Sequence, residues 1–257
     1  LEGGQEFILK VCDKNNDYFR EKYFLTLFQD QIPVPKIIQA LPPLNHVHGA
    51  ILMERLPGEL LNPRELTKSL ASTLGCVLAK VHAHRLSGYG DPLEKNSYQE
   101  PKTYFAFKFE EGLKECRHHL PKDVLISASK YFNTHLKLLE SVDGPCVVHR
   151  DFRPGNIMVN QGRLSGLIDW AGARASFAEE DFCSLLHKPW LNDYFPHFLK
   201  GYETIRKLPD YAPLIPFLRL NKAIATIGFT IKKGTWDKKD RRLYQYNIEF
   251  LKSLLSV

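Results

Sequence analysis

Residues 146–170 interrupt a chain whose pattern is otherwise mainly helical. Three short apolar runs, at 146–148, 157–159 and 167–168, flank a polar loop and then an isolated acid. Apolar runs of this length, bounded by Gly and Pro, are typical of buried strands. The segment therefore favours a fold in which strand ends inside a helical body hold a polar loop in place.

Three polar side chains of this segment are predicted to converge: Asp151, Asn156 and Asp169. Pro154-Gly155 permits a sharp bend, so that Asn156 can point back toward Asp151. Two carboxylates and an amide oxygen are hard donors, which suit Mg²⁺ better than zinc. Each residue taken singly is also typical of a turn or a helix cap, so the prediction depends on the ordered set.

The remaining pattern predicts an α+β chain with two lobes. A strand at 7–11, a helix at 17–30 and a strand at 49–54 precede a Pro-Gly turn at 57–58. Helical spacing of apolar residues then predicts helices at 63–85, 99–118, 122–141, 191–207, 213–232 and 240–256. We expect a small strand-containing lobe over 1–57 and a large helical lobe over 58–257.

Composition excludes several classes of protein. The 257 residues are 44% hydrophobic and 25% charged, which is ordinary globular usage. No uninterrupted apolar run has the length of a membrane span, so we expect no membrane insertion. The five cysteines are scattered and form no CxxC pair, which favours a reducing compartment and hence the cytoplasm.

The basic charge is concentrated at the end of the chain. Residues 201–257 carry 11 Lys and Arg against 5 Asp and Glu, which accounts for the whole net charge of +6. A solvated helix face explains such a surplus, and attraction for an anionic partner is the alternative. No helix-turn-helix, zinc-finger or aromatic-basic RNA motif accompanies it, so we expect no nucleic-acid partner.

The 149–170 segment resembles the catalytic loop of the aminoglycoside phosphotransferase and choline kinase-like family, which has the protein-kinase-like fold. The chain reads His-Arg-Asp-Phe-Arg-Pro-Gly-Asn-Ile-Met-Val over 149–159 and Ile-Asp-Trp over 168–170. That family typically has His-Gly-Asp before the Pro-Gly-Asn-Ile run and Ile-Asp-Trp or Ile-Asp-Phe after it. Asp181 follows Asp169 where the family often has a structural Asp that opens a helix.

The resemblance implies a nucleotide site in the N-terminal lobe. Lys10, in Ile-Leu-Lys-Val, resembles the strand lysine that holds nucleotide phosphates, and Glu21 resembles the acid that pairs with it. The segment 51–58 resembles the connector between lobes. There the adenine would meet backbone groups near Glu54 and Leu56, behind Met53.

The resemblance also implies an activity. Asp151 would accept or orient the proton of an acceptor hydroxyl, Asn156 and Asp169 would hold Mg²⁺, and His149 would brace the loop. The chain is expected to transfer the γ-phosphate of ATP to a hydroxyl of a small molecule, such as an aminoglycoside, an amino alcohol or a sugar. A regulatory pseudokinase and a protein kinase are the alternatives, although the short 169–181 span leaves little room for an activation segment.

Two departures from the family pattern stand out. Arg150 replaces the usual Gly of the loop, and we expect it to crowd the acceptor side. Relatives place two strands and a Gly-containing loop before the lysine strand, whereas five residues precede 7–11 here. We therefore expect an incomplete N-terminal lobe and a sequence that starts late.

The acceptor is the least specified part of the prediction. Family members build their acceptor site from the C-terminal helices, and in this chain those helices carry the basic surplus. Aminoglycosides are polycations that favour acidic pockets. A neutral or anionic small alcohol, amino alcohol or sugar is therefore predicted to be as good a candidate as an aminoglycoside.

Overall fold

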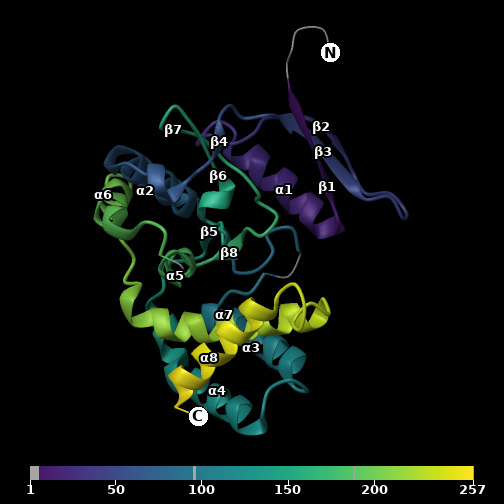
Figure 1. Ribbon diagram of the computed structural model, residues 1–257, viewed down its shortest axis with the longest axis vertical. Coiled ribbons are helices and arrows are strands. Elements are labelled where there is room, and N and C mark those ends of the chain that lie inside the picture. Colours follow the sequence, from purple (N-terminus) through teal and green to yellow (C-terminus); the bar gives the residue numbers. More distant parts are fainter. Residues whose placement is uncertain (1–5, 95–96, 188, 257) are drawn as a thin grey trace.

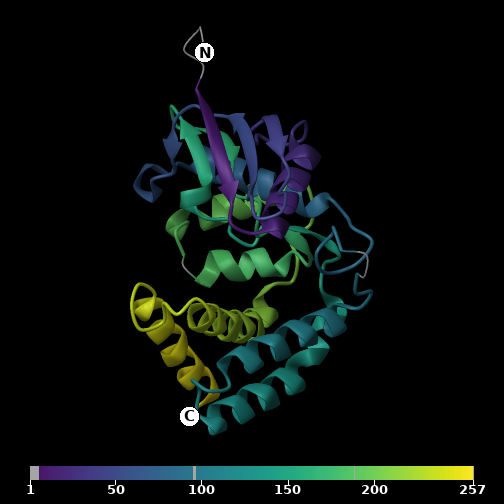
Figure 2. The same cartoon turned by 90° about the vertical axis from the view of Figure 1, so that its right-hand side faces the viewer.

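The computed structural model describes residues 6–94, 97–187 and 189–256. A strand-rich part lies at one end of the molecule and a bundle of helices at the other (Figure 1). The side view separates the two parts clearly, with the sheets above and the long C-terminal helices below (Figure 2). The predicted division into a strand-containing part and a helical part is observed.

The N-terminal sheet is antiparallel, in the order β1-β3-β2. It contains β1 (Phe7–Cys12), β2 (Ile37–Leu41) and β3 (Gly49–Glu54), and α1 (Asn15–Phe28) packs against it. Sequence reasoning predicted β1, α1 and β3 but not β2. Its residues, Ile-Ile-Gln-Ala-Leu, do not alternate cleanly between apolar and polar, so the pattern there does not predict a strand.

Two further small sheets carry the loop segment. One sheet has the order β4-β6-β7, from β4 (Glu59–Leu60), β6 (Ile157–Asn160) and β7 (Arg163–Leu167). The other pairs β5 (Cys146–Val148) with β8 (Arg174–Ser176). The predicted buried strand ends thus lie in two different sheets, 146–148 in one and 157–159 with Leu167 in the other.

Most helices follow the predicted ranges with shorter ends, whereas the helix Glu179–His187 lies outside the ranges that apolar spacing predicted. The helices are α2 (Lys68–Ala83), α3 (Pro101–Cys116), α4 (Lys122–His135), α5 (Glu179–His187), α6 (Phe195–Glu203), α7 (Ile215–Lys232) and α8 (Arg241–Leu255). The helix expected at 63–85 begins later, because Thr67 caps α2 by accepting a hydrogen bond from the Leu70 amide at 3.1 Å. Pro63–Glu65 forms a separate 3-10 turn.

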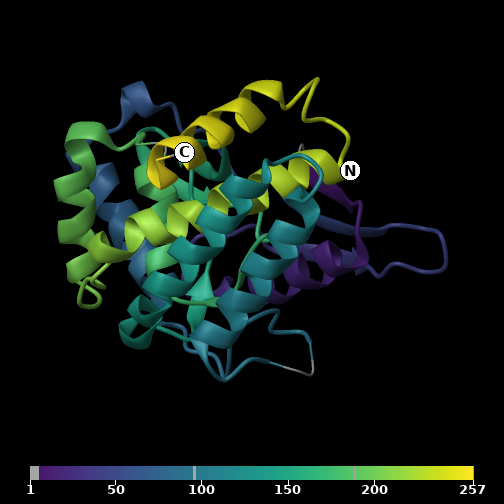
Figure 3. The same cartoon turned by 90° about the horizontal axis from the view of Figure 1, so that it is seen from below.

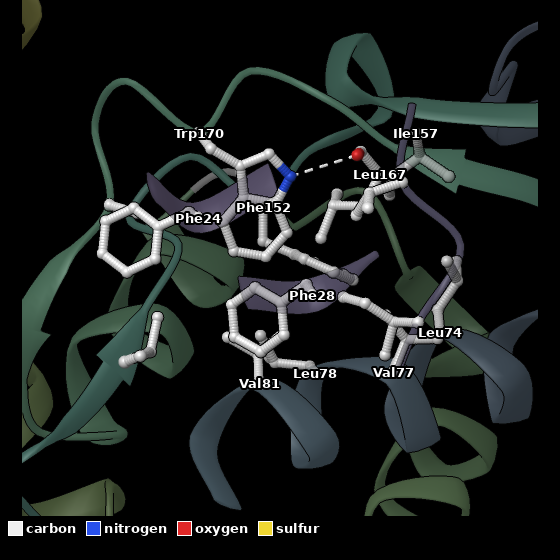
Figure 4. Packing of buried hydrophobic residues seen from close by; sticks show 14 of the residues in the cluster. Phe24, Phe28, Leu74, Val77, Leu78, Val81, Phe152, Ile157, Leu167 and Trp170 are labelled. Atoms are coloured by element: carbon white, nitrogen blue, oxygen red, sulfur yellow. Dashed lines mark hydrogen bonds between the residues drawn. The ribbon is translucent and has the colours of Figure 1, made fainter. Parts of the chain in front are cut away.

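One hydrophobic cluster joins the two parts of the molecule. Trp170, which is fully buried, stacks near Phe28 and Phe24 of α1, with ring centroids 4.8 Å and 6.0 Å apart (Figure 4). Its indole Nε1 donates to the Leu167 carbonyl at 3.2 Å. Aromatic burial of this size is a major source of stability, so the cluster fixes α1 against the end of β7.

A second cluster organises the helical part. Viewed from below, α7 crosses between α8 and α3, and both contact it (Figure 3).

The segment Ala212–Lys232, which includes α7, has the length and composition of a membrane span, with a mean hydropathy of 1.3. Half of that window is buried inside the fold, as in an ordinary core helix, so this is weak evidence for a span.

Candidate active site

A cavity of about 560 Å³ lies between the N-terminal sheet and the β6–β7 hairpin. Strand β1 and strand β3 supply one wall, and the ends of β6 and β7 supply the other. All the side chains that the sequence suggested for nucleotide or metal binding line this one cavity: Lys10, Glu21, Met53, Glu54, Leu56, Asn156 and Asp169. They come from segments far apart in the chain, so the fold has brought them together.

Lys10 forms ion pairs with two carboxylates that line the cavity, those of Glu21 and Asp169. Its ammonium lies 2.9 Å from Glu21 Oε2 and 2.8 Å from Asp169 Oδ1. Burial alone would lower the pKa of Lys10, but the two carboxylates outweigh it and the net shift is upward. Burial raises the pKa of Glu21, against the opposing attraction of Lys10. The lysine is therefore held firmly in its charged form.

The β6–β7 hairpin brings Asn156 and Asp169 side by side. Ile157 pairs with Leu167 across the hairpin, and the Ile168 amide donates to the Asn156 carbonyl at 3.0 Å. Asp169 follows with φ at 65°, a left-handed conformation that Asp adopts more readily than most residues. This turn directs the chain out of the hairpin at the cavity wall.

Asp151 follows β5, and its carboxylate contacts two other side chains of the loop, those of Asn156 and Arg153. Its carboxylate accepts from Asn156 Nδ2 at 2.7 Å, through Oδ2. Arg153 Nε donates to both carboxylate oxygens at 2.9 Å. Asp151 does not line the first cavity but lines a second one, so the Asn156–Asp151 hydrogen bond connects the linings of the two cavities.

A buried acid fixes the backbone of this loop. Asp181, on α5, accepts from the amides of His149 at 2.8 Å and Arg150 at 2.7 Å, and from His82 Nε2 at 3.1 Å. Burial alone would raise the pKa of Asp181, but these donors hold it below its usual value. The sequence had suggested a structural role for Asp181, and its contacts with the loop agree with that role.

His149 has the contacts of a structural residue. It is fully buried, and its Nδ1 accepts from the Asp151 amide at 3.3 Å. Its Nε2 lies 3.3 Å from the Ile168 carbonyl, on the far side of the hairpin. Burial lowers the pKa of His149, so the ring is neutral and can serve as donor and acceptor together.

Comparison with protein families decides where this arrangement belongs. Residues 1–217 match the model of the phosphotransferase enzyme family. The chain belongs to this family. No curated protein matches it.

Solved structures of phosphotransferases share its fold. The crystal structure of aminoglycoside phosphotransferase APH(4)-Ia aligns with a TM-score of 0.74 at 15% identity, over 99% of this chain and 87% of that chain. The ADP-bound structure of aminoglycoside phosphotransferase APH(2'')-Ib aligns with a TM-score of 0.65 at 18% identity, over 98% and 86%. The fold is therefore the two-lobed protein-kinase-like fold, with a strand-containing N-terminal lobe and a helical C-terminal lobe.

The oxygen donors in this phosphotransferase suit a magnesium ion bound together with phosphates. Asn156 is buried, and because its Nδ2 donates to Asp151, its Oδ1 is the oxygen left for a cation. Asp169 adds a carboxylate from the same cavity. Among the described residues, no group of three or more His, Cys, Asp or Glu side chains is placed to hold a metal. Two protein oxygens, with phosphates and water completing the shell, are what Mg²⁺ commonly uses.

The second cavity contains residues that sequence reasoning did not single out. It measures about 420 Å³ and is lined by Asp151, Arg150, Ser184 of α5 and Lys222 of α7, among others. Lys222 stands out in the sequence only as a cation within an apolar helix. Nothing in its spacing connects it to a loop some seventy residues earlier, because tertiary packing alone brings α7 beneath that loop.

Proposed function

We propose that the chain transfers the γ-phosphate of ATP to a hydroxyl of a small molecule. The observation that carries the proposal is the hydrogen bond by which Asn156, in the lining of one cavity, contacts Asp151, in the lining of the other. The first cavity is lined by the residue types with which the family binds nucleotides, and the second cavity has room for an acceptor. Phosphoryl transfer needs this kind of positioning more than it needs covalent chemistry from the protein.

The nucleotide would lie in the larger cavity. Lys10 would neutralise phosphate oxygens, with Glu21 holding the ammonium in place, and the adenine would contact the backbone of 54–56 behind Met53. Asn156 and Asp169 would hold Mg²⁺, which supplies charge neutralisation on the phosphates when bound. The Lys10–Asp169 contact at 2.8 Å would have to open for both residues to engage their ligands.

Asp151 would act on the acceptor. Its Oδ2 is engaged by Asn156, and Arg153 Nε bridges both oxygens. An entering hydroxyl would displace part of the Arg153 contact and donate its hydrogen bond to the carboxylate. The acceptor oxygen then forms a bond to the γ-phosphorus, the bond from that phosphorus to the bridging oxygen of ADP breaks, and Asp151 receives the proton.

The other candidate functions rest on weaker support. In a pseudokinase, ATP would bind without turnover, yet nothing in the loop forbids catalysis, since Asp151, Asn156 and Asp169 are all retained. For a protein kinase, β8 and α5 already fill the span from 174 to 187. We infer a cytoplasmic enzyme, because ATP is abundant there and the five cysteines are free thiols.

The test is ADP release from ATP in the presence of candidate acceptors. Aminoglycosides, choline-like amino alcohols, and neutral and acidic sugars are each added with and without Mg²⁺. Acceptor-dependent, Mg²⁺-dependent ADP release supports the proposal. ATP binding without any turnover across the panel contradicts it and favours the pseudokinase.

A further inference from the structure

The second cavity places two cations beside Asp151, where an acceptor would lie. Four charged side chains line it: Arg150, Asp151, Glu180 and Lys222. A smaller adjoining hollow of about 240 Å³ shares Arg150, Asp151 and Lys222 and adds Arg153. The charges of this cavity therefore decide which acceptors it can hold beside Asp151.

Lys222 is a cation without a carboxylate partner. It projects from the apolar helix α7, is half-buried, and its Nζ donates to Ser184 Oγ at 2.7 Å. Within the described part of the chain it forms no ion pair. Burial lowers the pKa of Lys222, and the Arg150 guanidinium lowers it too, while Cys183, Asp181 and Asp151 act in the opposite direction without reversing the net downward shift. An anionic ligand would remove this penalty.

Arg150 occupies a backbone position that suits glycine better. Its φ is 66°, in the left-handed region, and Asp181 holds it there through the Arg150 amide. An arginine in this conformation is strained by roughly 1 kcal/mol or more relative to a glycine. Strain of this kind is retained where the side chain has a use, and this guanidinium lines both hollows beside Asp151.

The acids of the cavity already have partners. Glu180 Oε1 accepts from Ser176 Oγ at 2.7 Å, and its Oε2 lies 3.5 Å from Arg150 Nε. Asp151 is engaged by Arg153. Among the described residues, Lys222 is therefore the cation of this cavity that forms no ion pair with a carboxylate, and Arg150 keeps donors that Glu180 does not reach. A polycationic acceptor would meet like charge at both places.

We propose that the acceptor is an alcohol bearing an anionic group, a carboxylate or a phosphate, which Lys222 and Arg150 bind while the hydroxyl meets Asp151. The inference rests on the proposed function and narrows it to a substrate class. Arg150 can engage such a group through two parallel N–H bonds, and Lys222 adds a single charged donor.

The first experiment compares acceptors that share one carbon frame and differ in charge. Glycerol, glycerate, glycerophosphate and aminopropanediol form one set, and glucose, glucuronate and glucosamine form another. We expect kcat/KM for ADP release to be at least about 10-fold higher with an anionic member than with its neutral counterpart, the scale of one charge-assisted hydrogen bond. Glycerate against glycerophosphate separates a carboxylate site from a phosphate site.

Two variants connect that preference to the cavity. Lys222→Met keeps the length of the side chain and fits an apolar helix, and Arg150→Gly restores the residue type usual for the family. Each is expected to reduce the anionic preference about 10-fold, mainly through KM. Lys232→Met is the matched control, since Lys232 lies on the same helix, is exposed and pairs with Glu115 at 3.1 Å. It should leave the preference unchanged.

A binding measurement separates the two proposals if no acceptor is turned over. The nucleotide cavity is saturated with AMP-PNP and Mg²⁺, and the Tm is followed as phosphate, sulfate, glycerate or glucuronate is added. A rise in Tm that Lys222→Met abolishes and Lys232→Met retains supports the anion site even when the proposed catalysis fails.

Three results would overturn the anion site. They are a preference for the cationic member of either set, an anionic preference that survives in both Lys222→Met and Arg150→Gly, and, without turnover, no anion-induced rise in Tm that depends on Lys222.

Discussion

The ammonium of Lys10 lies between two carboxylates, 2.9 Å from Oε2 of Glu21 and 2.8 Å from Oδ1 of Asp169. Glu21 belongs to α1, whereas Asp169 follows the β6–β7 hairpin. A single cation thus connects the N-terminal sheet, the helix beside it and the proposed metal site. The contact places the charge of Lys10 where nucleotide phosphates would have to enter.

Replacement of Lys10 by Met should weaken both stability and nucleotide binding. Glu21 has a side chain only 2% exposed, so it would be left as a buried charge without its partner. We expect unfolding to become easier by roughly 1–3 kcal/mol, less than for a fully buried pair because Lys10 retains some exposure. The Kd for ATP should rise about 10-fold or more. Urea unfolding and calorimetric titration with ATP measure the two effects.

The double variant Lys10→Met with Glu21→Gln serves as the control. Removing the buried charge should recover part of the lost stability, because an amide costs less to bury than a carboxylate. The affinity for ATP should stay low. An unchanged Kd in Lys10→Met would contradict the proposed phosphate contact.

Asp151→Asn should stop turnover and leave nucleotide binding intact. The amide can still accept from Arg153, so the loop should keep its shape, but it takes up a proton far less readily. We expect kcat to fall about 10²–10⁴-fold. The Kd for ATP should stay constant, because Asp151 lines the acceptor cavity and not the nucleotide cavity.

The matched control for Asp151 is Asp193→Asn. Asp193 is exposed on the turn before α6 and lines neither of the two cavities. It should retain full activity under the same assay. Full activity in Asp151→Asn would remove Asp151 from the mechanism.

Much of the loop region could be predicted because its order is local. Asn156 and Asp169 flank a short hairpin, and the short apolar runs at 157–159 and 167–168 predicted the buried strand ends that form it. Asp151 is only five residues from Asn156, so a Pro-Gly bend is enough to bring them into contact. Over such short spans, sequence spacing translates directly into distance.

The other features of the site depend on tertiary packing, which cannot be predicted from the spacing of residues in the sequence. Lys222 reaches the second cavity because α7 packs beneath α5, and no periodicity in 213–232 predicts which residue would face the loop. The contact of Arg153 with Asp151 requires a side-chain conformation, not a motif. The strain at Arg150 was also hidden, although the family's usual Gly at this position was a hint that φ is positive.

Arg150→Gly should stabilise the protein while it weakens the anion site. Glycine adopts a φ of 66° without a clash, so the strain at this position is relieved. The greater freedom of glycine in the unfolded chain offsets part of the gain, which leaves an expected net stabilisation of up to about 1 kcal/mol. Arg150→Ala is the comparison, since it removes the same guanidinium but keeps the unfavourable φ. Equal stability of the two variants in urea unfolding would contradict the strain.

Two buried histidines should make stability depend on pH. Burial lowers the pKa of His82 and of His149 from a usual value of 6.5. Below pH 6.5 the unfolded chain therefore binds protons that the folded chain does not, so stability is lost as the pH falls. Each histidine contributes a slope of up to about 1.4 kcal/mol per pH unit. Glu179 opposes this trend, because burial raises its pKa to about 7 and makes the folded chain the better proton binder between pH 4.5 and 7.

The comparison with His82→Gln isolates one of these contributions. His82 Nδ1 lies 2.8 Å from the Tyr202 hydroxyl and its Nε2 lies 3.1 Å from Asp181, and a glutamine amide can donate and accept in the same directions. We expect the stability difference between wild type and variant to shift by up to about 1.4 kcal/mol per unit between pH 6.5 and pH 5, with Glu179 cancelling in the difference. His46→Gln, at an exposed loop position, should show no such shift. Parallel pH profiles for wild type and His82→Gln would show that His82 is protonated in the folded protein as readily as in the unfolded chain.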